Sequence, residues 1–488
     1  MSLPSRTRPR LILGICCLSV LIVGVDNTIV TIALPSMRSD LHASFTDLQW
    51  TVDAYQLVLG AFLLMAGAIA DRWGRRRTLQ IGLTIFSVAS LLCGLAPSVG
   101  WLVGFRILQA LGASMMNPVA MAIVAQAYPD PKKRAKAYGV WSGIYGLSMA
   151  IGPVIGGVLV GTAGWRSIFW TNVPIGIIAI VLCALFVSES RSPTPRKHDP
   201  VGQALVVITL LALTYAIIEG QSLGWASTEI LALFVTVAVA ATALVRWELR
   251  QAEPLIDPRF FASAPFAGGV VMSLVGMSGA GGYLWVMTFF LQDSKQMSPV
   301  AAGLFLLPVA VMVFLFAPVA GRLAAARGPR TPLVISGTAI AVSAALLTHL
   351  HQSAPAWILI ISLVLFGLGF AMLNAPITSI AVAGMPAAQS GVASAMASTS
   401  RQVGQAIGVA VVGAIVIPGI SNAAVGTSIA AASHPGWWTV AAAGGCVAVL
   451  AFLTTSRRAM NSAEAVTRNL AARKPVPVEA EASFVRRN

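Results

Sequence analysis

The chain has 488 residues, of which 57% are hydrophobic and only 10% are charged, with a mean hydropathy of +0.81. A soluble domain carries about 25% charged residues, so this composition excludes a soluble protein and, with it, a cytosolic enzyme. The net charge of +15 is a feature of many nucleic-acid-binding proteins, but the positions of the basic residues, described below, assign the charge to another role.

Long apolar runs follow one another along the chain and predict its architecture. They exceed about 20 residues and do not alternate polar with apolar positions, which favours membrane-spanning helices over a membrane β-barrel. We predict an all-α integral membrane protein with fourteen spans. The spans are expected at residues 11–35, 48–70, 78–97, 101–126, 137–161, 168–188, 200–219, 228–247, 266–291, 299–321, 331–350, 355–384, 393–420 and 435–455.

The basic residues lie almost entirely on one side of these predicted spans. With the N-terminus in the cytosol, 28 of the 32 Lys and Arg fall in cytosolic segments, including Arg401 near the start of a span. Only Arg38, Arg166 and Lys295 remain outside, and Arg106 lies within a span. This asymmetry is the positive-inside rule, so both termini are predicted to be cytosolic and no nucleic acid is expected as a partner.

A degenerate internal repeat predicts two halves. The loop after the second span reads GAIADRWGRRR (67–77), and the loop after the tenth reads GRLAAARGPR (321–330). Their offset of eight spans, rather than six, predicts two six-helix halves separated by two inserted spans. The predicted parts are a cytosolic N-tail (1–10), an N-terminal half (11–188), a linker with the inserted helices (189–265), a C-terminal half (266–455) and a disordered cytosolic tail (456–488).

Three ionisable residues stand alone inside the predicted spans: Asp26, Asp53 and Arg106. Such residues are costly in hydrocarbon and usually mark a substrate, ion or proton pathway. At a rise of 1.5 Å per residue, Asp26 lies about 22 Å from the cytosolic end of its span, and the other two lie about 8 Å from the outer ends of theirs. We therefore expect all three in one layer of the outer half.

In such a layer the arginine favours ionised carboxylates, whereas desolvation favours protonated ones. A carboxylate balanced between these two effects can exchange a proton for a cation. The three residues are therefore candidates for proton coupling and for binding a substrate cation. The alternative is a purely structural ion pair between Arg106 and one acid, which leaves the second acid unexplained.

The repeated loop contains Gly67, Asp71, Arg72, Gly74 and Arg75. Asp71 stands at the cytosolic end of the second span, where it can cap the third span and pair with the arginines. We interpret the loop as a gating latch between two helices, which must open when the halves rock. A plain basic stop after a span explains the arginines but neither the acid nor the glycines.

The fifth predicted span carries Gly152, Pro153, Gly156 and Gly157. Small residues allow membrane helices to approach closely, and a proline inside a helix introduces a kink. The pattern by itself does not distinguish a specialised role of these residues from ordinary helix packing.

Aromatic and polar residues near the lone charges predict a substrate cavity. The candidates are Trp50, Tyr55, Gln109, Trp141 and Tyr145. Carboxylates combined with aromatic rings suit lipophilic cations, through ion pairing and cation–π contact. Aromatic residues near span ends also serve as interfacial anchors, and this alternative stays open for Trp50. The chain has no Walker loop and no metal-ligand spacing of Cys or His, so neither a cofactor nor a metal is predicted.

Several of these motifs together resemble the major facilitator superfamily, and within it the fourteen-span drug:proton antiporter family. The resemblance covers roughly residues 11–455. The similar motifs are the loop at 67–77, the buried-arginine motif RILQALG (106–112), the glycine motif GLSMAIGPVIGG (146–157), the first-span motif DNTIVTIALP (26–35) and the link WRSIFWTNVP (165–174). The first-span motif departs from the family's pattern in one position, because Thr31 replaces the usual Asn.

The resemblance implies a major-facilitator fold, proton-driven antiport and a multi-pass location in the bacterial cytoplasmic membrane. Family members that export quaternary ammonium compounds and dyes resemble this chain in having an acid at the position of Asp53. The implied partners are small amphipathic cations, protons and the lipid bilayer, and the implied functional unit is a monomer. Export of an endogenous metabolite or antibiotic by the same fold stays open, whereas the buried charges argue against a non-transporting sensor.

Overall fold

The computed structural model describes residues 9–191, 199–251, 254, 257–351, 353–383, 385, 390–421 and 429–473. Every regular element within these residues is a helix, which agrees with the predicted all-α architecture. The elements are α1 (Pro9–Leu41), α2 (Phe45–Trp73), α3 (Arg75–Gly94), α4 (Val99–Ala127), α5 (Pro131–Ala163), α6 (Ser167–Trp170), α7 (Asn172–Phe186), α8 (Pro200–Leu223), α9 (Thr228–Arg250), η1 (Pro258–Ala262), α10 (Ala264–Phe289), η2 (Phe290–Ser294), α11 (Pro299–Phe305), α12 (Leu307–Arg327), α13 (Arg330–Ala345), α14 (Ala356–Ala371), α15 (Asn374–Val382), α16 (Ser390–Ser421), α17 (Ile429–Ala432), α18 (His434–Thr454) and α19 (Arg457–Arg473).

Eleven helical segments of the described chain are long and apolar enough to cross a membrane, or twelve when the two parts of the bent helix α2 are counted as one span. Each of the fourteen predicted segments coincides with one helix or with two consecutive helices. Two of them fall short of a full span by this measure. Helix α13 has only 16 residues, and in α5 the apolar stretch is Ile151–Ala163. The structure thus supports a polytopic helical membrane protein, and the count of fourteen stays a prediction.

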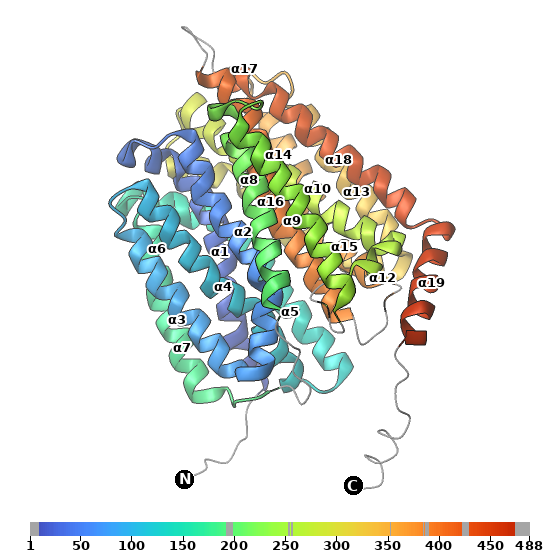
Figure 1. The fold of residues 1–488 in the computed structure, drawn as a ribbon. Coiled ribbons are helices and arrows are strands. Elements are labelled where there is room, and N and C mark those ends of the chain that lie inside the picture. Colours follow the sequence, from blue (N-terminus) through green and yellow to red (C-terminus); the bar gives the residue numbers. More distant parts are fainter. Residues whose placement is uncertain are drawn as a thin grey trace, which may run out of the picture.

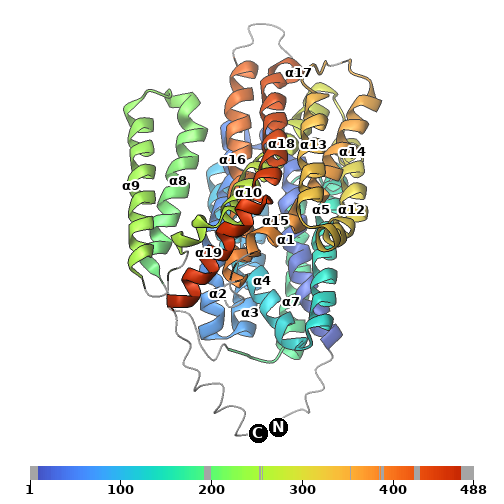
Figure 2. The same ribbon diagram turned by 90° about the vertical axis from the view of Figure 1, so that its right-hand side faces the viewer.

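The helices form two groups that meet along the middle of the molecule (Figure 1). Helices α1–α7 pack on one another and so do α10–α18, while α2 contacts α16 and α5 contacts α11 and α12 across the boundary. Helices α8 and α9 form a hairpin beside the bundle (Figure 2), in which α8 lies against α2 and α16. We call the end at which α1 begins, lower in Figure 1, the basal end, and the opposite end the apical end.

Small residues bring α3 and α4 into backbone contact within the first group. A Cβ atom on Gly112 of α4 would lie 2.5 Å from the backbone nitrogen of Phe86 in α3. A Cβ atom on Gly82 of α3 would lie 2.9 Å from the carbonyl oxygen of Gly112. Neither distance leaves room for a side chain. This close packing positions the site described below. Helix α4 carries Arg106 and Gln109, and α3 carries Ser90, whose hydroxyl accepts a hydrogen bond from Gln109.

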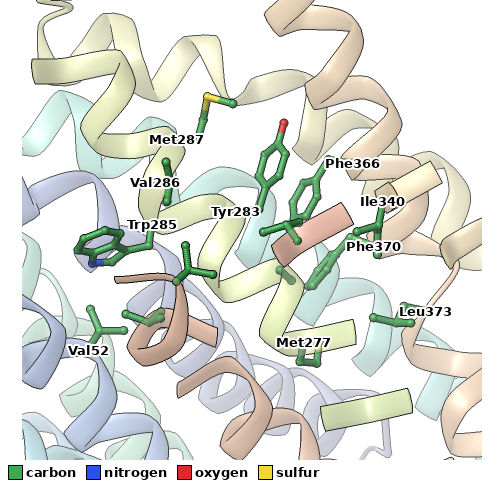
Figure 3. Packing of buried hydrophobic residues seen from close by; sticks show 14 of the residues in the cluster. Val52, Met277, Tyr283, Trp285, Val286, Met287, Ile340, Phe366, Phe370 and Leu373 are labelled. Carbon is green, nitrogen blue, oxygen red and sulfur yellow. The ribbon is translucent and has the colours of Figure 1, made fainter. Parts of the chain in front are cut away.

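Aromatic side chains fill the second group around α10 (Figure 3). The rings of Tyr283 in α10 and Phe366 in α14 are fully buried and stack with their centroids 3.9 Å apart. The hydroxyl of Tyr283 lies 2.7 Å from that of Ser362, so the polar end of the buried ring has a partner. Helix α10 is therefore held rigidly against α14 near the centre of the molecule.

The predicted disordered tail is wrong for its first part, because residues Arg457–Arg473 form the helix α19. Its residues Ala459, Ala463 and Val466 are buried, and their spacing places them on one helix face. The hydroxyl of Ser462 accepts a hydrogen bond from the backbone N–H of Ala264 at the start of α10 (3.0 Å). The tail was predicted to be disordered from its composition, which does not reveal the periodic spacing of these apolar residues. Residues 474–488 of the predicted tail lie outside the described residues.

Candidate functional site

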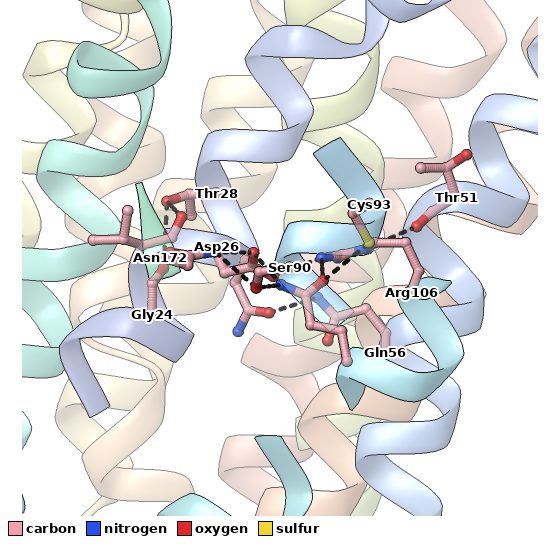
Figure 4. Close-up of polar contacts among 12 residues, drawn as sticks. Gly24, Asp26, Thr28, Thr51, Gln56, Ser90, Cys93, Arg106 and Asn172 are labelled. Carbon is pink, nitrogen blue, oxygen red and sulfur yellow. Dashed lines mark hydrogen bonds and ion pairs between the residues drawn. The ribbon is translucent and has the colours of Figure 1, made fainter. Parts of the chain in front are cut away.

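A buried polar network joins α1, α2, α3, α4 and α7 of the first group (Figure 4). Asp26 of α1 has no exposed surface, and its Oδ2 accepts a hydrogen bond from Nη1 of Arg106 in α4 at 2.6 Å. Its Oδ1 accepts from Nε2 of Gln109 (2.9 Å) and from Nδ2 of Asn172 (3.0 Å). Both carboxylate oxygens of Asp26 are thus satisfied by hydrogen-bond donors.

Arg106 is equally well surrounded. Its Nη1 also donates to Oε1 of Gln109 at 2.6 Å, and its Nε donates to the backbone carbonyl of Thr51 in α2 at 3.3 Å. The guanidinium lies over the ring of Tyr55, 4.0 Å from the centroid, and 5.8 Å from the ring centroid of Phe169. A cation that is buried in an apolar bundle needs such compensation, and here an acid, an amide, a carbonyl and two rings supply it.

Two members of this network, Asn172 and Ser90, were not predicted as site residues. Asn172 begins α7 and is 3% exposed, and Ser90 of α3 accepts a hydrogen bond from Nε2 of Gln109 at 2.8 Å. Gln109 follows Arg106 by one helical turn, so both side chains reach the same side of α4. Both could have been recognised as polar side chains inside otherwise apolar spans. They are uncharged, however, and uncharged polar residues are less conspicuous in the sequence than Asp26 or Arg106.

Asp53 does not join the network, so the described residues do not show two acids gathered around Arg106; the shared layer stays a prediction. Within the described residues, neither of its carboxylate oxygens has a hydrogen-bond partner, although the side chain is fully buried. The reason is helix geometry: Asp53 is two residues beyond Thr51, which turns its side chain about 200° away from Arg106. Gln49, one turn before Asp53, donates to the carbonyl of Val409 in α16 (2.9 Å), so Asp53 lies on the face of α2 that is turned toward the second group.

The predicted aromatic cavity is only partly assembled. Tyr55 lies beneath Arg106 as described, but Trp50 turns to the inserted hairpin. Its Nε1 donates to Oε1 of Glu219 in α8 (3.0 Å), and its ring centroid is 5.7 Å from that of Tyr215. The prediction of Trp50 as a cavity residue is therefore not supported by its position, and its role is to dock α8 onto α2.

Trp141 and Tyr145 lie one turn apart on α5, at the boundary between the groups. A Cβ atom on Gly24 of α1 would lie 3.2 Å from Cδ2 of Tyr145, so the tyrosine packs closely on α1 two residues before Asp26. The indole Nε1 of Trp141 is buried and has no hydrogen-bond partner within the described residues. Both residues are partly exposed, which leaves them available to a ligand between the groups.

The loop at 67–77, which we interpreted as a gating latch, holds helices of the first group together. Nη2 of Arg75 lies 3.1 Å from Oδ1 of Asp71, which ties the end of α2 to the start of α3. Arg72 is exposed, and Gly67 has open space around it. Gly74 has a φ of +118°, a conformation that side-chain-bearing residues rarely adopt. The structure brings these residues together within one group, and no contact of theirs with the second group is described.

The predicted cap on α3 is assigned to the wrong acid. The backbone N–H groups of Arg76 and Arg77 donate to the two carboxylate oxygens of Glu189, at 3.1 and 3.2 Å. Glu189 follows α7, so it links the end of that helix to the free N–H groups and positive dipole end of α3. Asp71 is occupied with Arg75 instead.

Replacing Glu189 with Gln should lower the thermal midpoint of the purified protein by a few degrees. The substitution removes the charge that interacts with the helix terminus and with Arg77, and the loss of an N-terminal cap typically costs about 1 kcal/mol. Tryptophan fluorescence during heating measures the midpoint. The matched control is Glu464→Gln on the exposed face of α19; an equal shift for both variants would argue against the cap.

The glycine motif of α5 places this helix between the two groups. Cβ atoms on Gly152 and Gly156 would clash with Thr28 and Ile29 of α1, whereas one on Gly157 would lie 2.5 Å from the carbonyl oxygen of Pro299 at the start of α11. The carbonyl of Pro153 in turn approaches Gly303 of α11 too closely for a side chain there. These residues allow α5 to pack against both groups at once, which accounts for the motif by packing.

Comparison with known proteins places these features in context. A family model described as Major Facilitator Superfamily matches residues 16–409. The multidrug resistance protein Stp of Mycobacterium tuberculosis is 33% identical over 404 residues, which cover 83% of this chain and 75% of that protein. The tetracenomycin C resistance and export protein of Streptomyces glaucescens is 36% identical over 412 residues, covering 84% and 76%. A crystal structure of a POT family transporter in complex with 5-aminolevulinic acid is similar in fold, with a TM-score of 0.67 at 15% identity, and the match covers 90% of this chain and 94% of that one.

Proposed function

The chain belongs to the Major Facilitator Superfamily, and on that premise we propose that it is a proton-coupled antiporter that exports lipophilic cationic drugs, such as quaternary ammonium compounds and dyes. It is a multi-pass transporter of the bacterial cytoplasmic membrane and not an enzyme. The printed names of its relatives, which are resistance and export proteins, support a drug as the cargo.

We assign the basal end to the cytosol. The loop after α2, the start of α5 and the end of α12 all lie at this end, and together they carry many of the basic residues of the chain. This distribution follows the positive-inside rule and supports cytosolic termini.

With α5 and α13 included, the helices supply fourteen spans: six in each group and two in the α8–α9 hairpin, which supports halves at 11–188 and 266–455. One chain contains both groups and the whole network, which supports a functional monomer.

The two groups are closed against each other at the apical end. Gln49 bonds to α16 as described, Nε2 of Gln292 donates to the carbonyl of Ile32 (2.9 Å), and Arg38 lies 3.6 Å from Asp293. A cavity between α1, α5, α10, α12 and α14 measures only about 30 Å³, space for about one water molecule. We propose that the drug enters from the basal side, which we assign to the cytosol, and that the apical contacts break for its release.

The observation that carries the proposal is the contrast between the two buried acids. Asp26 is fully occupied by Arg106, Gln109 and Asn172, whereas Asp53 is buried with no partner within the described residues. We assign Asp26 to the proton and Asp53 to the substrate cation. A proton that arrives from outside converts the Asp26 carboxylate to an acid and ends its ion pair with Arg106. Release of that proton to the cytosol restores the pair seen here.

Asp53→Asn should impair divalent cations more than monovalent ones. A dication needs both buried acids as negative centres in the apolar interior, Asp53 and also Asp26 once its proton has left. The variant removes one of them while it preserves the shape of the side chain, and Asp26 remains for a monocation. We expect at least a tenfold loss of efflux efficiency for a bis-quaternary compound and a smaller loss for a mono-quaternary one. Efflux of both compounds is measured side by side in everted vesicles. Equal losses would mean that Asp53 serves proton coupling or structure.

A screen in everted vesicles energised by a pH gradient tests the function itself. It compares monovalent cations, divalent cations and neutral compounds, each with and without an uncoupler that collapses the gradient. Accumulation of cations that stops on addition of the uncoupler is the expected result. Accumulation that is insensitive to the uncoupler would contradict proton coupling.

Export of an endogenous metabolite or antibiotic is the second candidate function. The relative named for tetracenomycin C resistance and export favours it. The same vesicle screen distinguishes the two functions when it includes neutral polycyclic compounds: preference for these over cations would support the second candidate.

A further inference from the structure

A second arginine is buried in the molecule, in the group opposite Arg106. Arg401 is the twelfth residue of α16, about 17 Å along that helix from its basal end. Its predicted place among the cytosolic residues near a span entrance is wrong, because it lies deep within α16. No acidic residue lies within ion-pair distance of Arg401 in the described part of the chain.

The partners of Arg401 are neutral. Its Nη1 donates to Oγ1 of Thr378 in α15 (3.2 Å), and its Nη2 donates to Oγ of Ser398, one turn earlier in α16 (2.6 Å). Both hydroxyls donate their own protons to helix carbonyls, at Asn374 and Ser394. The hydroxyls therefore orient the guanidinium without neutralising it. Of the five N–H groups that a guanidinium carries, these two bonds leave the others available.

Unlike Arg106, Arg401 has no acidic partner among the described residues. Both arginines lie deep in the bundle, but Arg106 has a carboxylate at 2.6 Å and is 2% exposed. Arg401 lacks such an acid and keeps part of its surface accessible. A charge in this setting is costly unless it has a partner of opposite sign or access to water. An anion that reaches the accessible surface of Arg401 would supply the partner of opposite sign that it lacks among the described residues.

The neighbouring residues across the group boundary are also hydrogen-bond donors. Tyr145 of α5 interacts electrostatically with Arg401, is hydrogen-bonded to the side chain of Asn27 in α1, and is itself partly exposed. Trp141, one turn toward the basal end on the same helix face, has the buried indole N–H without a partner described above. Helix α5 packs mainly on α1, α11 and α12, so it borders both groups.

We propose that Arg401 and Tyr145 form an anion subsite that binds a carboxylate or another negatively charged oxygen of the substrate. This inference rests on the proposed export function and extends its substrate class from cations to zwitterions. The positive centre of such a molecule is held by Asp53 and its negative centre by Arg401. A guanidinium can bind a carboxylate through two parallel N–H···O bonds, which gives this subsite its selectivity.

A matched pair of dyes tests the subsite: a rhodamine ester, which is a cation, and the free carboxylic acid obtained by hydrolysing that ester, which is a zwitterion. Equilibrium binding of each dye to the purified protein in nanodiscs is measured by fluorescence polarisation, without any gradient. For Arg401→Gln we expect at least a tenfold weaker affinity for the acid and a change of less than twofold for the ester. Arg401→Lys should give an intermediate loss for the acid, because it keeps the charge but not the planar geometry.

The control is Arg322→Gln at the exposed basal end of α12, which removes the same charge far from the subsite and should leave both affinities unchanged. Unaltered binding of the ester shows that the Arg401 variants are folded. The proposal is overturned if wild type does not bind the acid, if Arg401→Gln binds the acid as wild type does, or if both dyes lose affinity equally. Gradient-driven efflux of the ester by wild type is measured separately. Absence of this efflux would contradict the proposed export function, whereas the binding measurements would still test the anion subsite.

Discussion

Asp26→Asn is expected to abolish proton-driven efflux while leaving the protein folded and able to bind its substrates. Asparagine has the size of aspartate and keeps one carbonyl oxygen that can accept from Gln109 and Asn172. It cannot take up or release a proton. Arg106 retains the Gln109 oxygen, the Thr51 carbonyl and the Tyr55 ring, which limits the cost of losing the ion pair.

Two assays separate the loss of coupling from the loss of structure. Efflux in everted vesicles driven by a pH gradient should fall to the level of vesicles without the transporter. Exchange of labelled for unlabelled substrate at equal pH on both sides should continue, because it needs no net proton movement. Undiminished efflux driven by the gradient in the Asp26→Asn vesicles would exclude Asp26 as the proton carrier.

Arg106→Ala should shift the pH dependence of transport in addition to lowering its rate. The guanidinium stabilises the ionised form of Asp26, so its removal lets the carboxyl keep its proton at a higher pH. Release to the cytosol then becomes the difficult step, and the pH at which efflux is half-maximal should rise. The measurement is efflux across a series of pH values in vesicles that contain matched amounts of wild type and variant.

Arg106→Lys is the companion variant. Lysine restores the positive charge, but it lacks the planar donors that reach Asp26, Gln109 and Thr51 together. Activity should recover in part and the pH profile should return toward that of wild type. An Arg106→Ala protein with the wild-type pH profile would show that Arg106 is not coupled to the proton site.

The helices could be predicted closely, because hydrophobic length is a local signal in a membrane protein. The boundaries of α3, α4, α10 and α18 agree with the predicted spans to within a few residues. Periodicity within polar segments was harder to recognise. Helix α19 has a weak apolar stripe among charged residues, and its composition suggested disorder instead.

The candidate site could be predicted in part. Isolation in an apolar span identifies a charge but not the direction in which it points. Asp26 and Arg106 do meet, but Asp53 faces the second group, because a shift of two residues along a helix reverses the side. Arg401 was missed for a different reason: it was grouped with the cytosolic basic residues, although the predicted span at 393–420 contains it. Glu189 contacts α3 across more than a hundred residues, and no sequence pattern connects them.

The central claim is that a carboxylate of this site exchanges a proton for the substrate, and proton release on binding tests it most directly. Purified protein in a weakly buffered solution is mixed with a mono-quaternary ammonium dye, and a pH indicator records the protons released. We predict that wild type releases protons in a saturable way with the same midpoint as dye binding, and that Asp26→Asn binds the dye but releases fewer. Saturable binding of the dye to wild type without any release of protons, across the pH range in which transport operates, would contradict the exchange.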